Sequence, residues 1–88
     1  MIYRISWDRD AFRILEELWD EHRDHDVLVR ALDEIHDQLT EDAEQKGESR
    51  SRGRRVLLAP PLGILFQAQS RLGEVLIVRV WFIRPRSS

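Results

Sequence analysis

Residues 56–83, with the sequence VLLAPPLGILFQAQSRLGEVLIVRVWFI, determine the fold of this chain. Apolar runs at 56–59, 64–68 and 75–83 are interrupted by the segments PPLG and QSRLG. Short apolar runs bounded by proline, glycine and serine are typical of β-strands joined by turns. The stretch therefore predicts three consecutive strands in an antiparallel meander.

The last of these runs has apolar residues on both of its alternating faces. Side chains at every second position of a strand share a face, and the helices of a small domain cover only one face of its sheet. The other face would then be an apolar stripe containing an arginine, which is typical of an interface. We predict a partner-binding set formed by Ile77, Arg79, Trp81 and Ile83. A loop of the chain itself, or a second copy in a homodimer, is the alternative cover.

Two helices are expected before the meander. Residues 3–7 alternate apolar and polar side chains and predict a short strand. Asp8 is a suitable N-cap for a helix over 8–22, and Asp24 or Asp26 for a second helix that ends near Gly47. One face of that second helix is apolar: Leu28, Ala31, Leu32, Ile35 and Leu39.

These elements follow one another in the order β-α-α-β-β-β. We predict a single α+β domain over residues 1–88, with a mobile tail at 84–88. The short connection between the helices predicts a hairpin. This helical hairpin would pack on one face of a mainly antiparallel four-stranded sheet.

The charges divide the chain into two halves. Residues 8–48 carry 15 acidic and 5 basic side chains, whereas residues 49–88 carry eight arginines and one acid, Glu74. Such asymmetry indicates an anionic partner for the basic half. The alternative is that the two halves neutralise each other.

Several kinds of site are excluded or disfavoured by composition. There is no cysteine, so disulfides, thiol catalysis and Cys-ligated zinc are excluded. His22 and His25 with neighbouring aspartates lack a third fixed ligand, so we predict no metal and no cofactor.

The N-terminus lacks the apolar region of a signal peptide. No run approaches the ~20 apolar residues that span a bilayer, so we expect a cytoplasmic protein without membrane contact.

The run ESRSRGRR at 48–55 is the first candidate for chemistry. Several arginines in an exposed segment can hold phosphates. In RNA cleavage, Glu48 could act as the base while Arg50, Arg54 and Arg55 supply positive charge. The alternative is a solvated loop paired with the acidic helices. Trp81 could stack on a base or anchor a peptide, and its aliphatic neighbours favour the peptide.

The pattern resembles the RelE/ParE family of toxins from bacterial type II toxin–antitoxin systems. Four segments carry the resemblance: ALDEI at 31–35, GESR at 47–50, PLGILF at 61–66 and VRVW at 78–81. The predicted element order matches as well. The resemblance implies a toxin that binds a cellular target and is neutralised by a cognate antitoxin. It also implies two targets, since RelE-like members cut messenger RNA on the ribosome and ParE-like members bind DNA gyrase.

The resemblance also implies roles for individual residues. The basic positions leading into the second strand match Arg50, Arg52, Arg54 and Arg55, and one past the last strand matches Arg84. Gly63 stands where RNA-cleaving members usually carry an arginine. We therefore expect a protein-binding toxin. A ribosome-dependent endoribonuclease with an incomplete catalytic set (Glu48, Arg50, Arg54, Arg55, Arg84) and a non-toxic homodimeric binding module are the alternatives.

Overall fold

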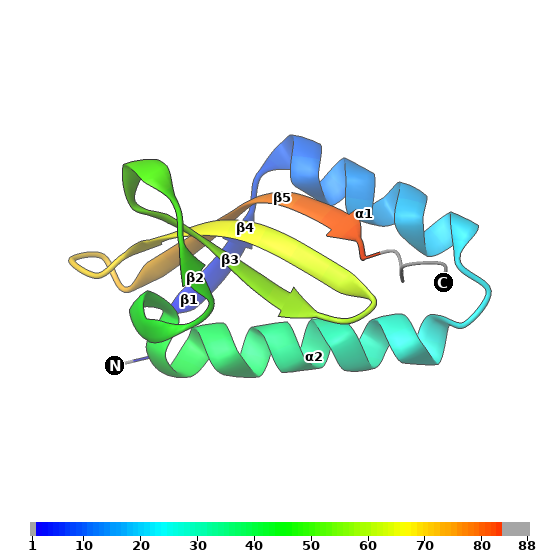
Figure 1. The fold of residues 1–88 in the computed structure, drawn as a ribbon, viewed down its shortest axis with the longest axis horizontal. Coiled ribbons are helices and arrows are strands. Elements are labelled where there is room, and N and C mark those ends of the chain that lie inside the picture. The colour runs from blue at the N-terminus through cyan, green and yellow to red at the C-terminus, as the bar shows by residue number, and fades with distance from the viewer. Residues whose placement is uncertain (1, 84–88) are drawn as a thin grey trace.

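A computed structural model describes residues 2–83 of the chain. Figure 1 shows two helices packed against a twisted sheet. In chain order the elements are β1 (Arg4–Trp7), α1 (Arg9–Glu21), α2 (His25–Asp42), the 3-10 turn η1 (Ala43–Gln45), β2 (Glu48–Ser49), the 3-10 turn η2 (Ser51–Gly53), β3 (Arg54–Ala59), β4 (Leu62–Gln69) and β5 (Glu74–Phe82). The predicted tail at 84–88 lies outside the described residues.

The sheet has five strands in the order β1-β5-β4-β3-β2. β1 runs parallel to β5, and the other neighbours are antiparallel. The predicted α+β class is confirmed, but the predicted count of four strands is wrong. The additional strand is β2, in which Glu48 pairs with Val56 and Ser49 with Arg55. A two-residue strand is too short to show a period of its own in the sequence.

Both helices begin at aspartate caps, as the sequence predicts. The Asp8 carboxylate accepts a hydrogen bond from the backbone N–H of Asp10 at 3.1 Å, and that of Asp24 accepts from Val27 at 3.2 Å. These contacts satisfy N–H groups that lack partners within the first turn. The end of α2 differs from the prediction, because the helix stops at Asp42 and tightens into η1 before Gly47.

The core lies between α2 and the sheet. The largest fully buried side chains are Phe66, Leu28, Ile35, Leu39, Leu62, Ile64, Ile77 and Val75. Three of them recur on one side of α2, as its apolar periodicity predicts. Helix α1 packs along β5, while α2 contacts β1, β3 and β4. Within residues 2–83, neither helix combines the length and apolarity needed to cross a bilayer.

Tyr3, the single tyrosine, should titrate at higher pH in the folded chain than in urea. Its side chain is 5% exposed, and burial together with the charges of Glu44 and Asp42 raises its pKa above the ordinary 10.0. Because the folded pKa is the higher one, the neutral phenol stabilises the fold below about pH 10. That stability is lost as the pH rises through the folded pKa.

The measurement for Tyr3 is the phenolate absorbance during an alkaline titration, with and without urea. Tyr3→Phe is the control variant that should abolish the transition. Identical midpoints in the folded and unfolded chain would contradict the assignment.

Candidate functional site

Helix α2 packs on one face of the sheet and α1 packs along β5. The face opposite α2 is here called the open face. The two faces are distinguished by alternation in β3, where Leu57 and Ala59 are buried but Leu58 is 55% exposed. Strand pairing places three cross-strand rows on the open face, each with one residue from β3, β4 and β5 in that order. The first row is Leu58, Gly63 and Trp81, and the second is Val56, Leu65 and Arg79. The third row is Arg54, Gln67 and Leu76. The rows change from apolar, beside the β3–β4 turn, to polar and cationic.

A β-bulge in β5 changes the direction in which its side chains point. Leu65 pairs with Arg79, whereas the next residue, Phe66, pairs with Ile77. Val78 is therefore an extra residue without a partner on β4. One extra residue shifts the two-residue alternation by one position.

The bulge divides the predicted partner-binding set between the two faces. Ile77 is fully buried in the core, next to Val75, and Val80 continues the core after the bulge. Arg79 and Trp81 lie on the open face. The strict alternation predicted for this strand is therefore wrong beyond Ile77, and Ile77 does not contribute to an exposed surface.

Trp81 lies directly over Gly63. A Cβ atom added to Gly63 would lie 2.6 Å from Cε2 and 2.6 Å from Nε1 of the indole. No atom of a larger residue fits there unless the ring moves. The indole therefore occupies the space above the position where the family resemblance calls for an arginine.

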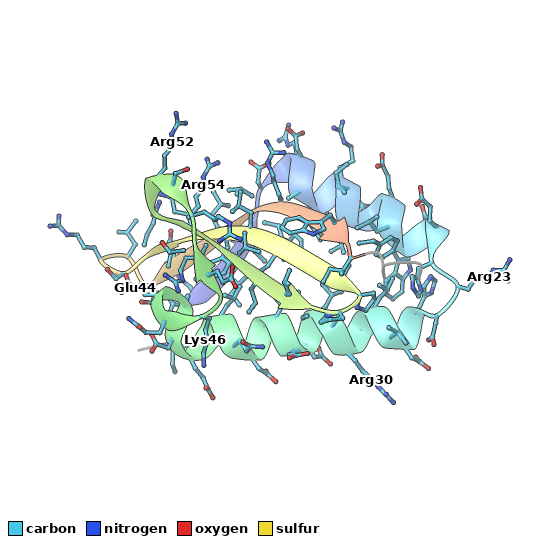
Figure 2. All side chains as sticks on the ribbon, in the orientation of Figure 1. Arg23, Arg30, Glu44, Lys46, Arg52 and Arg54 are labelled. Carbon is cyan, nitrogen blue, oxygen red and sulfur yellow. The ribbon has the colours of Figure 1, made fainter. Side chains whose placement is uncertain are left out.

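Arginine side chains border the open face on the β2–β3 side. They surround a hollow of about 470 Å³ whose lining includes Arg50, Arg52, Arg54 and Arg79, with Val56, Leu65 and Trp81 as its apolar part. Figure 2 shows Arg52 and Arg54 projecting from the β2–β3 region on the side away from α2, from which Arg30 projects. The hollow therefore joins basic residues from a loop and two strands.

The charges of this border are only partly compensated. Arg50 pairs with Glu48 at 3.2 Å and donates to the carbonyl of Ser49 at 3.0 Å. Within residues 2–83, no carboxylate lies within 4.0 Å of the guanidinium groups of Arg52, Arg54 or Arg79. The border therefore offers three cations to an anionic ligand, and two of them, Arg54 and Arg79, lie on strands of the open face.

Arg55 has a different place from the other arginines. Its Nε donates to the carbonyl of Lys46 at 2.6 Å, and its Nη2 donates to that of Gly47 at 3.0 Å. Its register partner is Phe66, which is fully buried beneath the helices. Arg55 therefore ties the β2 connection to the sheet on the helix side and is separated from Arg54, its neighbour in sequence.

Two predicted positions remain, Ile83 and Arg84. Ile83 is half-buried, and its backbone N–H donates to the carbonyl of Pro61 at 2.8 Å. It therefore closes the end of the sheet beside the β3–β4 turn. Arg84 lies outside the described residues.

The two histidines near the helix connection have structural contacts. Nδ1 of His22 accepts from the N–H of Asp24 at 3.0 Å, and the His25 ring stacks on Trp19 with centroids 4.0 Å apart. In the described part of the chain, no three His, Asp or Glu side chains are grouped to hold a metal ion.

The arrangement suits binding better than acid–base chemistry. Glu48 is exposed and paired with Arg50, and it lies beside the half-buried Val56 rather than in a dry pocket. A general base works best when burial or a neighbour raises its pKa and a reacting group is within reach. The open face instead combines apolar area with guanidinium groups, a combination common at protein interfaces.

The predicted partner-binding set lacks three apolar residues of this face, Val56, Leu58 and Leu65. The sequence predicts them as strand residues without assigning a direction to their side chains. Their signal is the alternation that begins at Arg54, where every second residue of β3 points to the open face.

Comparison with known proteins identifies a solved structure with a similar fold. No family model matches the chain, and no curated protein matches it. A solved structure described as the chromosomal ParDE TA system from P. aeruginosa is similar, with a TM-score of 0.60 and 19% sequence identity, over 94% of this chain and 98% of that one. The chain has a ParE-like fold. At this identity the comparison supports the fold and not a function, and the ParE-like fold confirms the architecture expected from the sequence.

Proposed function

We propose that this chain is the toxin component of a type II toxin–antitoxin system, which binds a cellular target in the cytoplasm and is neutralised by a cognate antitoxin. The observation that carries the proposal is the open face, with apolar rows at Leu58 and Trp81 bordered by Arg54 and Arg79. Contiguous apolar surface on a small domain is typical of an interface. The ParE-like fold supports the proposal, since the similar structure belongs to a toxin–antitoxin system.

The proposed mechanism is occlusion by binding, without a chemical step. Trp and Arg side chains contribute most of the affinity in many interfaces, and Trp81 and Arg79 are adjacent on this face. The antitoxin covers the face around these two residues and so competes with the target. The ribosome and DNA gyrase are the two targets that the family resemblance suggests.

Induced expression of the chain alone should arrest growth, and coexpression of a small protein encoded next to it should restore growth. The double variant Arg54→Ala with Arg79→Ala should grow normally, because it removes the unpaired cations that lie on strands of the open face. Arg30→Ala, on the outer side of α2, is the matched control and should remain toxic. Normal growth despite accumulation of the folded chain would reject toxicity. A sharp dimer without a copurifying partner would then favour a homodimeric binding module.

An endoribonuclease of the same fold is the second candidate. Its support is that Glu48, Arg50 and Arg54 line two hollows that have Arg50, Val56 and Trp81 in common. The same induced cultures distinguish the two, since cleaved message with normal plasmid supercoiling indicates the ribonuclease. Intact message with altered supercoiling indicates gyrase binding.

A further inference from the structure

We infer that the open face binds an acidic peptide segment of a protein partner, with apolar side chains at one end of the contact and carboxylates at the other. The inference rests on the proposed function for the identity of the partner as antitoxin or target. The chemistry of the segment follows from the three cross-strand rows themselves.

The apolar end of the site lies beside the β3–β4 turn. Leu58 is 55% exposed, and the Trp81 indole lies directly above Gly63. Val56 and Leu65 extend this surface into the next row. A tryptophan ring has only two rotatable side-chain bonds and therefore supplies contact area at a low cost in conformational entropy. This end therefore suits an aliphatic or aromatic anchor of the partner.

The cationic end begins one row further along the strands. Residues on one face of a strand are roughly 7 Å apart, so Arg79 lies one interval from Trp81 along β5, and Arg54 lies two intervals from Leu58 along β3. Neither guanidinium has a carboxylate partner within the described chain. An incoming carboxylate can accept two parallel hydrogen bonds from a guanidinium. The distance between rows thus sets the spacing between the anchor and the acidic side chains of the partner.

A peptide fits this face better than a nucleic acid. Single-stranded nucleic acids bind through several aromatic platforms along a basic groove, but Trp81 is the one aromatic side chain in the three rows. The middle row offers the aliphatic Val56 and Leu65 instead.

The test measures binding of a short fluorescein-labelled peptide made of leucine and glutamate to the purified full-length chain by fluorescence anisotropy. Arg54→Ala, Arg79→Ala and Leu58→Ala should each lower the affinity by roughly tenfold. Arg30→Ala should leave the affinity unchanged. Higher salt should weaken binding, since exposed charge pairs are screened. Amide chemical shifts should change on β3, β4 and β5.

Three results would overturn the inference. In the first, peptides with glutamine or lysine in place of glutamate bind as tightly as the acidic peptide. In the second, a single-stranded RNA of mixed sequence binds more tightly and depends on the same arginines. In the third, the free chain is a dimer that buries the open face. The chain could bind the peptide without arresting growth. That result would support the peptide site and reject the proposed toxin function, so failure of the inference is distinguishable from failure of the proposed function.

Discussion

Replacing Gly47 with alanine should destabilise the fold by about 3 kcal/mol or more. Gly47 has a φ of +70°, and a Cβ atom there would overlap the carbonyl oxygen of Val56 and lie 2.8 Å from its carbonyl carbon. Both atoms belong to the backbone of β3 and cannot rotate away. The added methyl group would therefore separate β2 from β3. It would also disturb the carbonyl group of Gly47, which accepts a hydrogen bond from Arg55.

Gly53→Ala is the matched control for this substitution. Gly53 has nearly the same backbone angle, with φ of +73°, but a Cβ atom there would meet nothing within 4 Å. Its substitution should cost only the left-handed backbone term of about 1 kcal/mol. Urea denaturation followed by circular dichroism measures both variants. Equal decreases in the free energy of unfolding would show that the contact with Val56 does not contribute to the destabilisation.

Replacing Phe66 with alanine should cost about 3–5 kcal/mol. Phe66 is fully buried, and it pairs with Ile77 where the bulge interrupts the ladder. The loss includes the transfer free energy of the ring and the cavity that remains. Small domains have a total stability of about 5–15 kcal/mol, so part of this variant should be unfolded at ordinary temperature.

Phe12→Ala on α1 is the comparison variant, because that ring is 49% exposed. Its edge-to-face contact with Trp7, with centroids 6.5 Å apart, should limit the loss to about 1 kcal/mol. Thermal and urea unfolding of both variants give the difference. Similar losses would mean that the core is not where the burial pattern places it.

The helical half of the fold could be predicted because its signals are local. The caps at Asp8 and Asp24 and the apolar spacing in α2 depend on residues within a few turns of each other. The end of α2 was less predictable. The chain leaves the helix after Asp42 through a 3-10 turn, and Gly47 instead lies against β3.

The candidate site could be predicted only in part, and Arg54 and Arg55 show the reason. Adjacent residues of a strand point to opposite faces, so a strand that begins at Arg54 must separate them. The sequence predicted a strand from Val56, with both arginines in a loop, and so grouped them as one set. In the structure Arg54 borders the open face, whereas Arg55 donates to Lys46 and Gly47.

The α+β class, the order of helices and strands, and the division into an acidic half and a basic half could all be predicted from the amino-acid sequence. These features depend on composition and on short-range periodicity. The set of arginines that shares a face with Trp81 could not be predicted in this way. That set depends on strand register and on the bulge at Val78, which arise from pairing between residues distant in the chain. The basic half is thereby divided into Arg55, which holds the fold together, and Arg54 and Arg79, which face outward.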